Sequence, residues 1–247
     1  MAKEKKDVDF AGKAVPSDSR KGLVTMFMIM LGFTFFSASM WVGQQLAEGL
    51  DFWGFVESLI LGGLILGAYT GLLGYVGAKT GLSLDLLAKR AFGEKGSYLP
   101  SAMISFTQIG WFGVGLAMFA IPVSKELLGG SDAAMWGLVI LAGVCMTASA
   151  YFGIDSLTIV SYIAVPLVAV LGTVAMIMAV NQGDGTIIDQ FAKSSGSLTI
   201  IGGAGLVVGS FVSGGTATPN FARFAKNGKV GAVTPVVAFF IGNSLMF

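Results

Sequence analysis

The feature that most constrains the fold of this chain is a series of long apolar runs separated by short polar segments. Six of these runs are each about 20 residues or longer, and they cover residues 22–47, 53–78, 98–124, 133–152, 157–180 and 197–217. A seventh run starts near Val230 and continues to Phe247. A helix of about 20 apolar residues crosses the ~30 Å hydrocarbon core of a bilayer, and the runs lack the alternation of barrel strands. The sequence therefore predicts an all-α polytopic membrane protein with the lipid bilayer as its solvent.

Composition excludes several other classes of protein. Of the 247 residues, 54% are hydrophobic and 12% are charged, about half of the ~25% charged residues in a typical soluble domain. The sequence has no histidine and one cysteine, Cys145, so it cannot supply a histidine-based catalytic triad, a Cys/His zinc site or a disulfide. We expect no enzyme activity, because groups for acid–base chemistry are scarce, and we expect no bound cofactor and no nucleic-acid partner.

The lysine and arginine residues predict how the spans are oriented. If the amino terminus is cytoplasmic and the loops alternate, 13 of the 15 basic residues lie on the cytoplasmic side. Lys125 and Lys193 are the two that lie on the other side. Because basic residues near spans stay in the cytoplasm, this asymmetry predicts a multi-pass protein with a cytoplasmic amino terminus. Residues 1–19 are polar and charged, which predicts a disordered cytoplasmic tail.

The segment 81–93 lies between the second and third spans. It mixes leucines with Asp85, Lys89 and Arg90, and it is too short and too charged to cross the membrane. Such a pattern fits a short helix at the inner membrane surface, and a solvated loop is the alternative.

The interior of the predicted bundle is neutral but has polar interruptions. No ionisable side chain lies near the middle of a run, which argues against a proton relay and against a strongly charged solute. The first run contains Ser37 and Ser39 at mid-depth, where a broken helix and close helix packing fit equally well. In the sixth run, Gly214-Gly215 followed by Pro219 favours a break that lines a cavity.

Two further patterns concern helix faces. Gly63, Gly67 and Gly71 recur at a spacing of four in the second run and are continued by Gly74 and Gly77, which predicts a face that another helix approaches closely. Gln108 and Trp111 fall on one face of the third span, near its middle. A tryptophan that anchors a span to the membrane surface belongs at the end of the span, whereas this pair suits a planar, neutral, hydrogen-bonding ring such as a nucleobase. On the residues alone, a ligand role and a packing role for Trp111 are equally supported.

Five stretches of the chain resemble the nucleobase–cation symporter family, and the resemblance extends from about residue 16 to the last residue. The stretches are residues 32–41, 74–82, 107–115, 207–216 and 238–247. The family implies a transporter fold of two five-helix inverted repeats with broken first and sixth helices. Residues 20–180 would then form the first repeat, and residues 181–247 would begin the second. We expect the chain to be the amino-terminal portion of a longer protein, unable to transport by itself.

The same resemblance implies a function and a set of site residues. The function is sodium-coupled cytosine uptake across a bacterial inner membrane by alternating access, carried out by a monomer when full length. The rings of Trp111 and Phe211 would sandwich the base, and Gln108 would hydrogen-bond its polar edge. Further contacts would come from three residues at the break in the sixth helix: Ser213, Gly214 and Gly215.

The coupling ion is the other implied ligand. Phe36, by its carbonyl, and Ser37 would form part of a sodium site, whose other ligands in the family come from an eighth span that follows residue 247. Gly214 stands where the family leads us to expect alanine, so the identity of the base is open. A purine, allantoin or a hydantoin is the alternative cargo, and a channel is a less favoured alternative mechanism.

Overall fold

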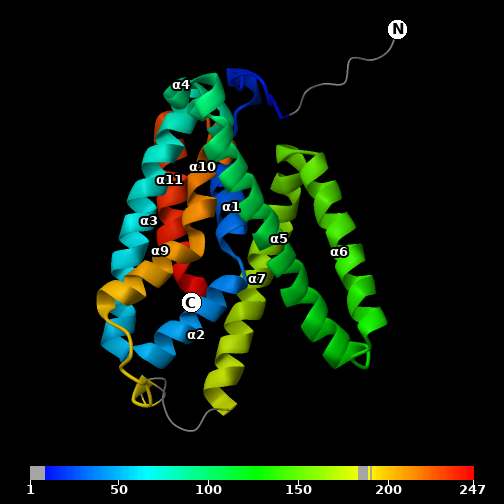
Figure 1. Ribbon diagram of the computed structural model, residues 1–247, viewed down its shortest axis with the longest axis vertical. Helices are drawn as coiled ribbons and strands as arrows, with labels where there is room; N and C mark the ends of the chain where they lie inside the picture. The colour runs from blue at the N-terminus through cyan, green and yellow to red at the C-terminus, as the bar shows by residue number, and fades with distance from the viewer. Residues whose placement is uncertain (1–8, 183–188, 190) are drawn as a thin grey trace.

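A computed structural model of the chain describes residues 9–182, 189 and 191–247. These residues form helices and no strand. Figure 1 shows the longer helices, and the elements in chain order are η1 (Ser17–Ser19), α1 (Leu23–Thr34), α2 (Ala38–Gly49), α3 (Phe52–Thr80), α4 (Leu84–Gly96), α5 (Tyr98–Leu127), α6 (Asp132–Tyr151), α7 (Ile154–Gln182), α9 (Ile200–Thr216), α10 (Thr218–Ala222), α11 (Gly228–Val237), η2 (Ala238–Gly242) and η3 (Ser244–Met246).

Several of these helices are long and apolar enough to cross a membrane. Five single spans in the described residues meet this test: α3, α5, α6, α7 and the continuous segment Gly228–Met246. The pair α1 and α2 meets it as one span that is bent by 60°. The predicted all-α polytopic fold is therefore confirmed, and so is the broken first helix.

The connections between helices gather at two ends of the bundle (Figure 1). At one end, the backbone N–H of Val15 donates to the carbonyl of Gly81, and the backbone N–H of Lys21 donates to the carbonyl of Phe224. The side chain of Lys21 forms an ion pair with the Asp155 carboxylate. This end therefore joins the start of α1 to the end of α3, the start of α7 and the α10–α11 turn. At the opposite end, Ser195 N–H donates to the carbonyl of Glu48, so the segment before α9 meets the α2–α3 turn.

Both predicted helix breaks occur, but the second lies further along the chain than predicted. After Thr34, Phe35 leaves the helical conformation (φ −77°, ψ 76°), and α2 begins at Ala38. In the sixth span, Gly214 and Gly215 lie inside α9, and the helix ends at Thr216, one residue before α10 begins. The predicted break at the two glycines is therefore wrong in position. Their missing side chains leave room for neighbouring aromatic rings and α3 rather than interrupting the backbone.

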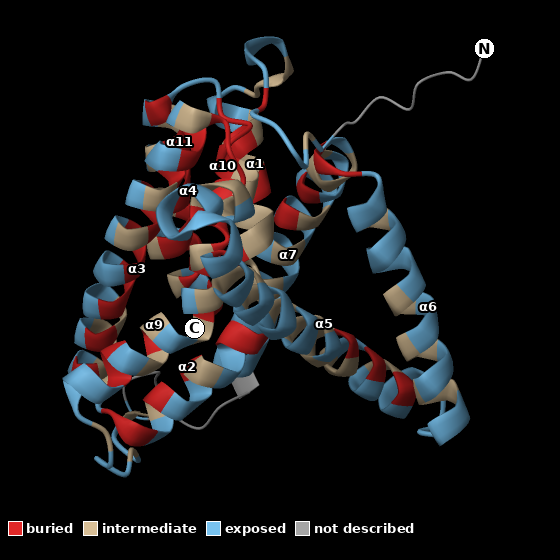
Figure 2. Cartoon of the chain, turned by 45° about the horizontal axis from the view of Figure 1, so that its top comes forward, coloured by how far each residue is buried: buried red, intermediate tan, exposed pale blue. Residues whose placement is uncertain are grey.

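The core lies where α3, α9 and the Gly228–Met246 segment meet, as the buried residues in Figure 2 show. The predicted glycine face of α3 contacts α11: a Cβ built on Gly74 would lie 2.0 Å from the carbonyl oxygen of Gly231. This approach confirms that the face serves helix packing. By contrast, α6 has no buried residue and stands away from this core (Figure 2).

The segment before α1 differs from the disordered tail predicted for residues 1–19, of which residues 1–8 lie outside the described residues. Val15 is 2% exposed, and the Arg20 guanidinium just after this segment donates to the carbonyls of Val15 and Ala78. The segment 9–19 is therefore packed across the ends of the helices. The two apolar residues Phe10 and Val15 are the sequence signal for this packing. The helix predicted over 81–93 is present as α4.

Candidate functional site

A cavity of about 220 Å³ lies beside the break in the first span. It is bordered by the α1–α2 break, α5, the carboxyl-terminal half of α9 and Met146 of α6. Six of the eight residues that the sequence predicts for the site line it: Phe36, Gln108, Trp111, Phe211, Ser213 and Gly214. The structure thus brings together residues from three segments that are far apart in the sequence.

Aromatic rings form much of the cavity wall. The ring of Phe36 lies 5.7 Å from Trp111 and 6.3 Å from Phe211, measured between centroids, and is nearly perpendicular to both. Phe211 in turn packs edge-to-face against Phe33 at 5.6 Å and against the fully buried Phe239 at 5.4 Å. Edge-to-face pairs at these distances are favourable, so Phe211 is held from behind by a rigid cluster.

The polar side chains at the cavity are neutral, and three of them have no hydrogen-bond partner among the described residues. In the part of the chain that the structure describes, the side chains of Gln108, Trp111 and Ser213 make no hydrogen bond. Ser210 differs, because its hydroxyl donates to the carbonyl of Val207 at 2.7 Å. None of the described residues that line the cavity is ionisable. The site therefore offers an amide, an indole N–H and a hydroxyl to a neutral ligand beside aromatic surfaces.

The two glycines of α9 have different surroundings. A Cβ on Gly214 would lie 3.0 Å from ring atoms of both Phe33 and Phe211, so the missing side chain gives these rings their present positions. Gly215 does not line the cavity. It is buried against α3 instead, where a Cβ would lie 3.0 Å from the side chain of Thr70. Its predicted contact with the ligand is not supported by this placement.

The residues predicted for the sodium site lie at the α1–α2 break. The carbonyl of Phe36 accepts a hydrogen bond from Ser39 N–H at 3.0 Å, which leaves one lone pair for another partner. Ser37 is exposed, does not line the cavity, and directs its hydroxyl at the sulfur of Met118 at 3.7 Å. Among the described residues, no group of three or more acidic, histidine or cysteine side chains could hold a metal ion. The backbone carbonyl is thus the group here that fits a hard cation best.

Part of the cavity lining was not predicted from the sequence. Phe33 and Phe36 fall three residues apart, and both rings reach the cavity, yet the sequence indicated only the carbonyl of Phe36. Met146 of α6 was also missed. The i, i+3 spacing of the two phenylalanines indicates a shared helix face. Because the helix breaks at Phe35, between them, this spacing does not predict where the ring of Phe36 points.

Comparison with known proteins identifies the family of the chain. Residues 14–247 match the family model described as permease for cytosine/purines, uracil, thiamine, allantoin. The chain belongs to this permease family. The family resemblance inferred from the sequence is therefore confirmed, and the chain is a multi-pass membrane protein. Its matched relatives are permeases, which agrees with the expectation that it is not an enzyme.

Two curated relatives show how much of this chain, and how much of each relative, is matched. The cytosine permease of Escherichia coli (strain K12) is 47% identical over 241 residues, which cover 98% of this chain and 57% of the relative. The allantoin permease of Bacillus subtilis (strain 168) is 33% identical over 73 residues, 30% of this chain and 15% of that protein. The chain thus spans a little more than half the length of the cytosine permeases that it matches.

A solved structure supports the fold. Mhp1, a nucleobase-cation-symport-1 family transporter in a closed conformation with bromovinylhydantoin bound, superposes with a TM-score of 0.83. The alignment covers 96% of this chain and 55% of that chain, at 13% sequence identity. The helices described above therefore have the arrangement of the corresponding part of this transporter fold.

Proposed function

We propose that the protein containing this chain imports cytosine together with sodium by alternating access. It would do so in a bacterial inner membrane, with its amino terminus in the cytoplasm. The observation that carries the proposal is the neutral aromatic cavity, where Gln108, Trp111 and Ser213 have unused hydrogen-bonding groups. The 47% identity to the cytosine permease of E. coli supports cytosine as the cargo.

The geometry suits a small planar base. Trp111 and Phe211 lie on α5 and α9, and both present rings to the cavity, so each offers a face on which a base can stack. The Gln108 amide has a donor and an acceptor, which match the mixed polar edge of cytosine. The absence of ionisable residues from the cavity lining favours a neutral ligand, because a charged one would lack a counter-charge.

Sodium fits the polar groups near the cavity better than a proton does. A proton-coupled carrier needs a titratable side chain at membrane depth, and none lines this cavity. The free lone pair on the carbonyl of Phe36 and the hydroxyl of Ser37 are hard oxygen groups of the kind that sodium prefers. We assign both residues to part of the sodium site, completed by groups outside this chain.

The test is uptake of labelled cytosine by proteoliposomes that contain the intact protein, with an inward gradient of sodium or of choline. We expect saturable uptake that sodium stimulates. Phe211→Ala should weaken cytosine binding by about tenfold, because stacking on an aromatic ring is worth ~1–3 kcal/mol per base. Uptake that does not saturate would contradict the carrier in favour of a channel, and equal uptake in choline would contradict sodium coupling.

A second cargo is favoured by two of the comparisons. One relative is named an allantoin permease, and the matched transporter structure has bromovinylhydantoin bound. Both names point to five-membered, hydrogen-bonding rings. Competition of labelled cytosine by allantoin, hydantoin and adenine distinguishes these cargoes, and we expect unlabelled cytosine to compete most strongly.

A further inference from the structure

The ring of Phe36 contacts both rings that we assign to the base. Its centroid lies 5.7 Å from that of Trp111 and 6.3 Å from that of Phe211, with interplanar angles of 84° and 85°. All three rings line the same cavity of about 220 Å³. A base that stacks on Trp111 or Phe211 must therefore lie beside the ring of Phe36.

The ring of Phe36 extends from the helix break toward the opposite wall of the cavity. Phe36 lies between α1 and α2, where its backbone N–H donates to the carbonyl of Thr34 at 2.9 Å. From there the ring reaches α5, where a Cβ built on Gly115 would lie 3.4 Å from its Cε2 atom. That distance is ordinary van der Waals contact, so the ring extends across the cavity from the break to α5.

The ring of Phe36 occupies space on one side of a small cavity. Pockets for drug-sized ligands occupy ~300–1,000 Å³, and this cavity of about 220 Å³ is smaller. A purine differs from a pyrimidine by one additional five-membered ring fused to the first. The six-membered ring of phenylalanine is larger than that addition, so its removal would leave space for a second ring.

We propose that the Phe36 side chain is the specificity-determining wall that limits the cavity to single-ring bases. The inference rests on the proposed function, because it assigns a size limit to the cytosine site. It gives Phe36 a role for its side chain that is separate from the role of its carbonyl. A smaller side chain at this position leaves the polar groups of Gln108 and Ser213 in place while it widens the space next to them.

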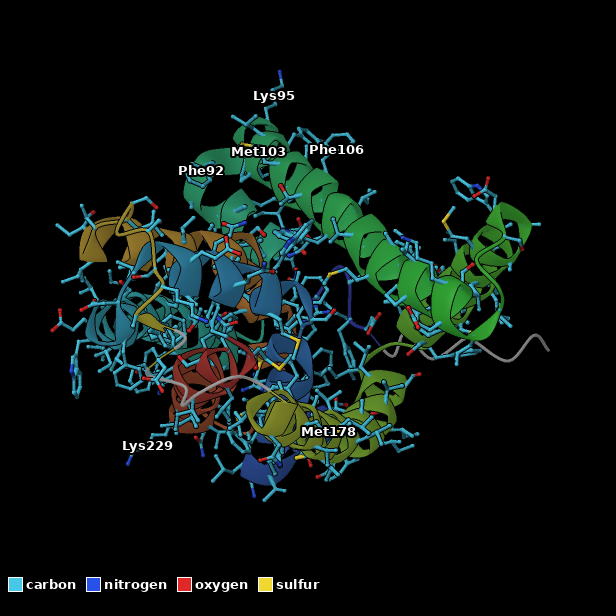
Figure 3. The ribbon with its side chains drawn as sticks, turned by 90° about the horizontal axis from the view of Figure 1, so that it is seen from below. Phe92, Lys95, Met103, Phe106, Met178 and Lys229 are labelled. Carbon is cyan, nitrogen blue, oxygen red and sulfur yellow. The ribbon has the colours of Figure 1, made fainter. Side chains whose placement is uncertain are left out.

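The test measures the ratio of two affinities in the intact, purified protein in the presence of sodium. Labelled cytosine is displaced by unlabelled cytosine and by adenine from the wild-type protein and from F36A, F36L and F106A. Phe106 is a matched control, because it is 74% exposed on α5 and points away from the bundle in Figure 3. A ratio is used because a general loss of folding or binding would lower both affinities together.

We expect F36A to shift the ratio toward adenine by about tenfold or more, since even one additional methylene in an apolar pocket is discriminated by ~10–200-fold. F36L should shift it less, and F106A should not shift it. If the ratio of adenine affinity to cytosine affinity in F36A and F36L equals that of the wild-type protein, the inference is wrong. It is also wrong if both variants are folded but bind neither base, since the ring is then needed for binding itself. Wild-type protein that binds no cytosine would instead contradict the proposed function.

Discussion

Gln108 is a residue whose replacement should weaken cytosine binding without changing the stability of the protein. Its amide lines the cavity and makes no hydrogen bond within the described part of the chain. Gln108→Leu should therefore weaken cytosine binding by about three- to tenfold, the equivalent of one hydrogen bond of ~0.5–1.5 kcal/mol, without lowering the melting temperature. Binding is measured by displacement of labelled cytosine, with Gln45→Leu on the exposed part of α2 as control. Unchanged affinity in Gln108→Leu would remove this residue from the site.

The individual residues also show which parts of the site a sequence can reveal. Gln108 and Trp111 were found because helical spacing places both on one face of α5. The direction of the Phe36 ring could not be predicted, because it depends on backbone angles at the break rather than on helical periodicity. The packing of Gly215 against α3 could not be predicted for a different reason. A missing side chain is equally compatible with a break, a ligand contact and close packing, and only the position of Thr70 distinguishes them.

At the scale of the helix, the contact between α3 and α11 depends on glycine. A Cβ on Gly74 would lie 2.0 Å from the carbonyl oxygen of Gly231 and 2.8 Å from Cγ of Pro235. Gly74→Ala should therefore lower the stability of the protein by about 1–3 kcal/mol, the usual cost of overpacking. The measurement is thermal unfolding in detergent. The matched control is Gly172→Ala on α7, where nothing lies within 4 Å of the added Cβ. Equal melting temperatures for the two variants would show that the helices can move apart at no cost.

The helices were the part of the fold easiest to predict. Long apolar runs correspond to α3, α5, α6 and α7, because a bilayer demands helices of that length. The glycine spacing also predicted which face of α3 packs, but it carried no information about its partner. The packed segment around Val15 was missed, since a few apolar residues among charged ones give no periodic pattern.

For the whole molecule, we propose that α1–α7 and the segment from α9 onward are two inverted copies of one structural unit. Each begins with an interrupted pair of helices, α1 with α2 and α9 with α10, and each pair is followed by an apolar segment long enough to span a membrane. The cavity lies where the two interrupted pairs meet, and residues of both line it. Helix breaks remove local backbone pairing, so it is there that polar groups become available to a solute inside an apolar bundle.

The orientation of the molecule in the membrane gives the last prediction. The connections gather at two ends, and the basic residues are divided unequally between them, so the end with α4 should face the cytoplasm. Lys95 on α4 and Lys193 before α9 are both exposed, which makes Lys95→Cys and Lys193→Cys a matched pair in a background without other cysteines. A membrane-impermeant maleimide added to spheroplasts should label Lys193→Cys directly. It should label Lys95→Cys only after the membrane is permeabilised. The reverse pattern would place the amino terminus outside, since α4 and the packed segment before α1 lie at the same end of the bundle.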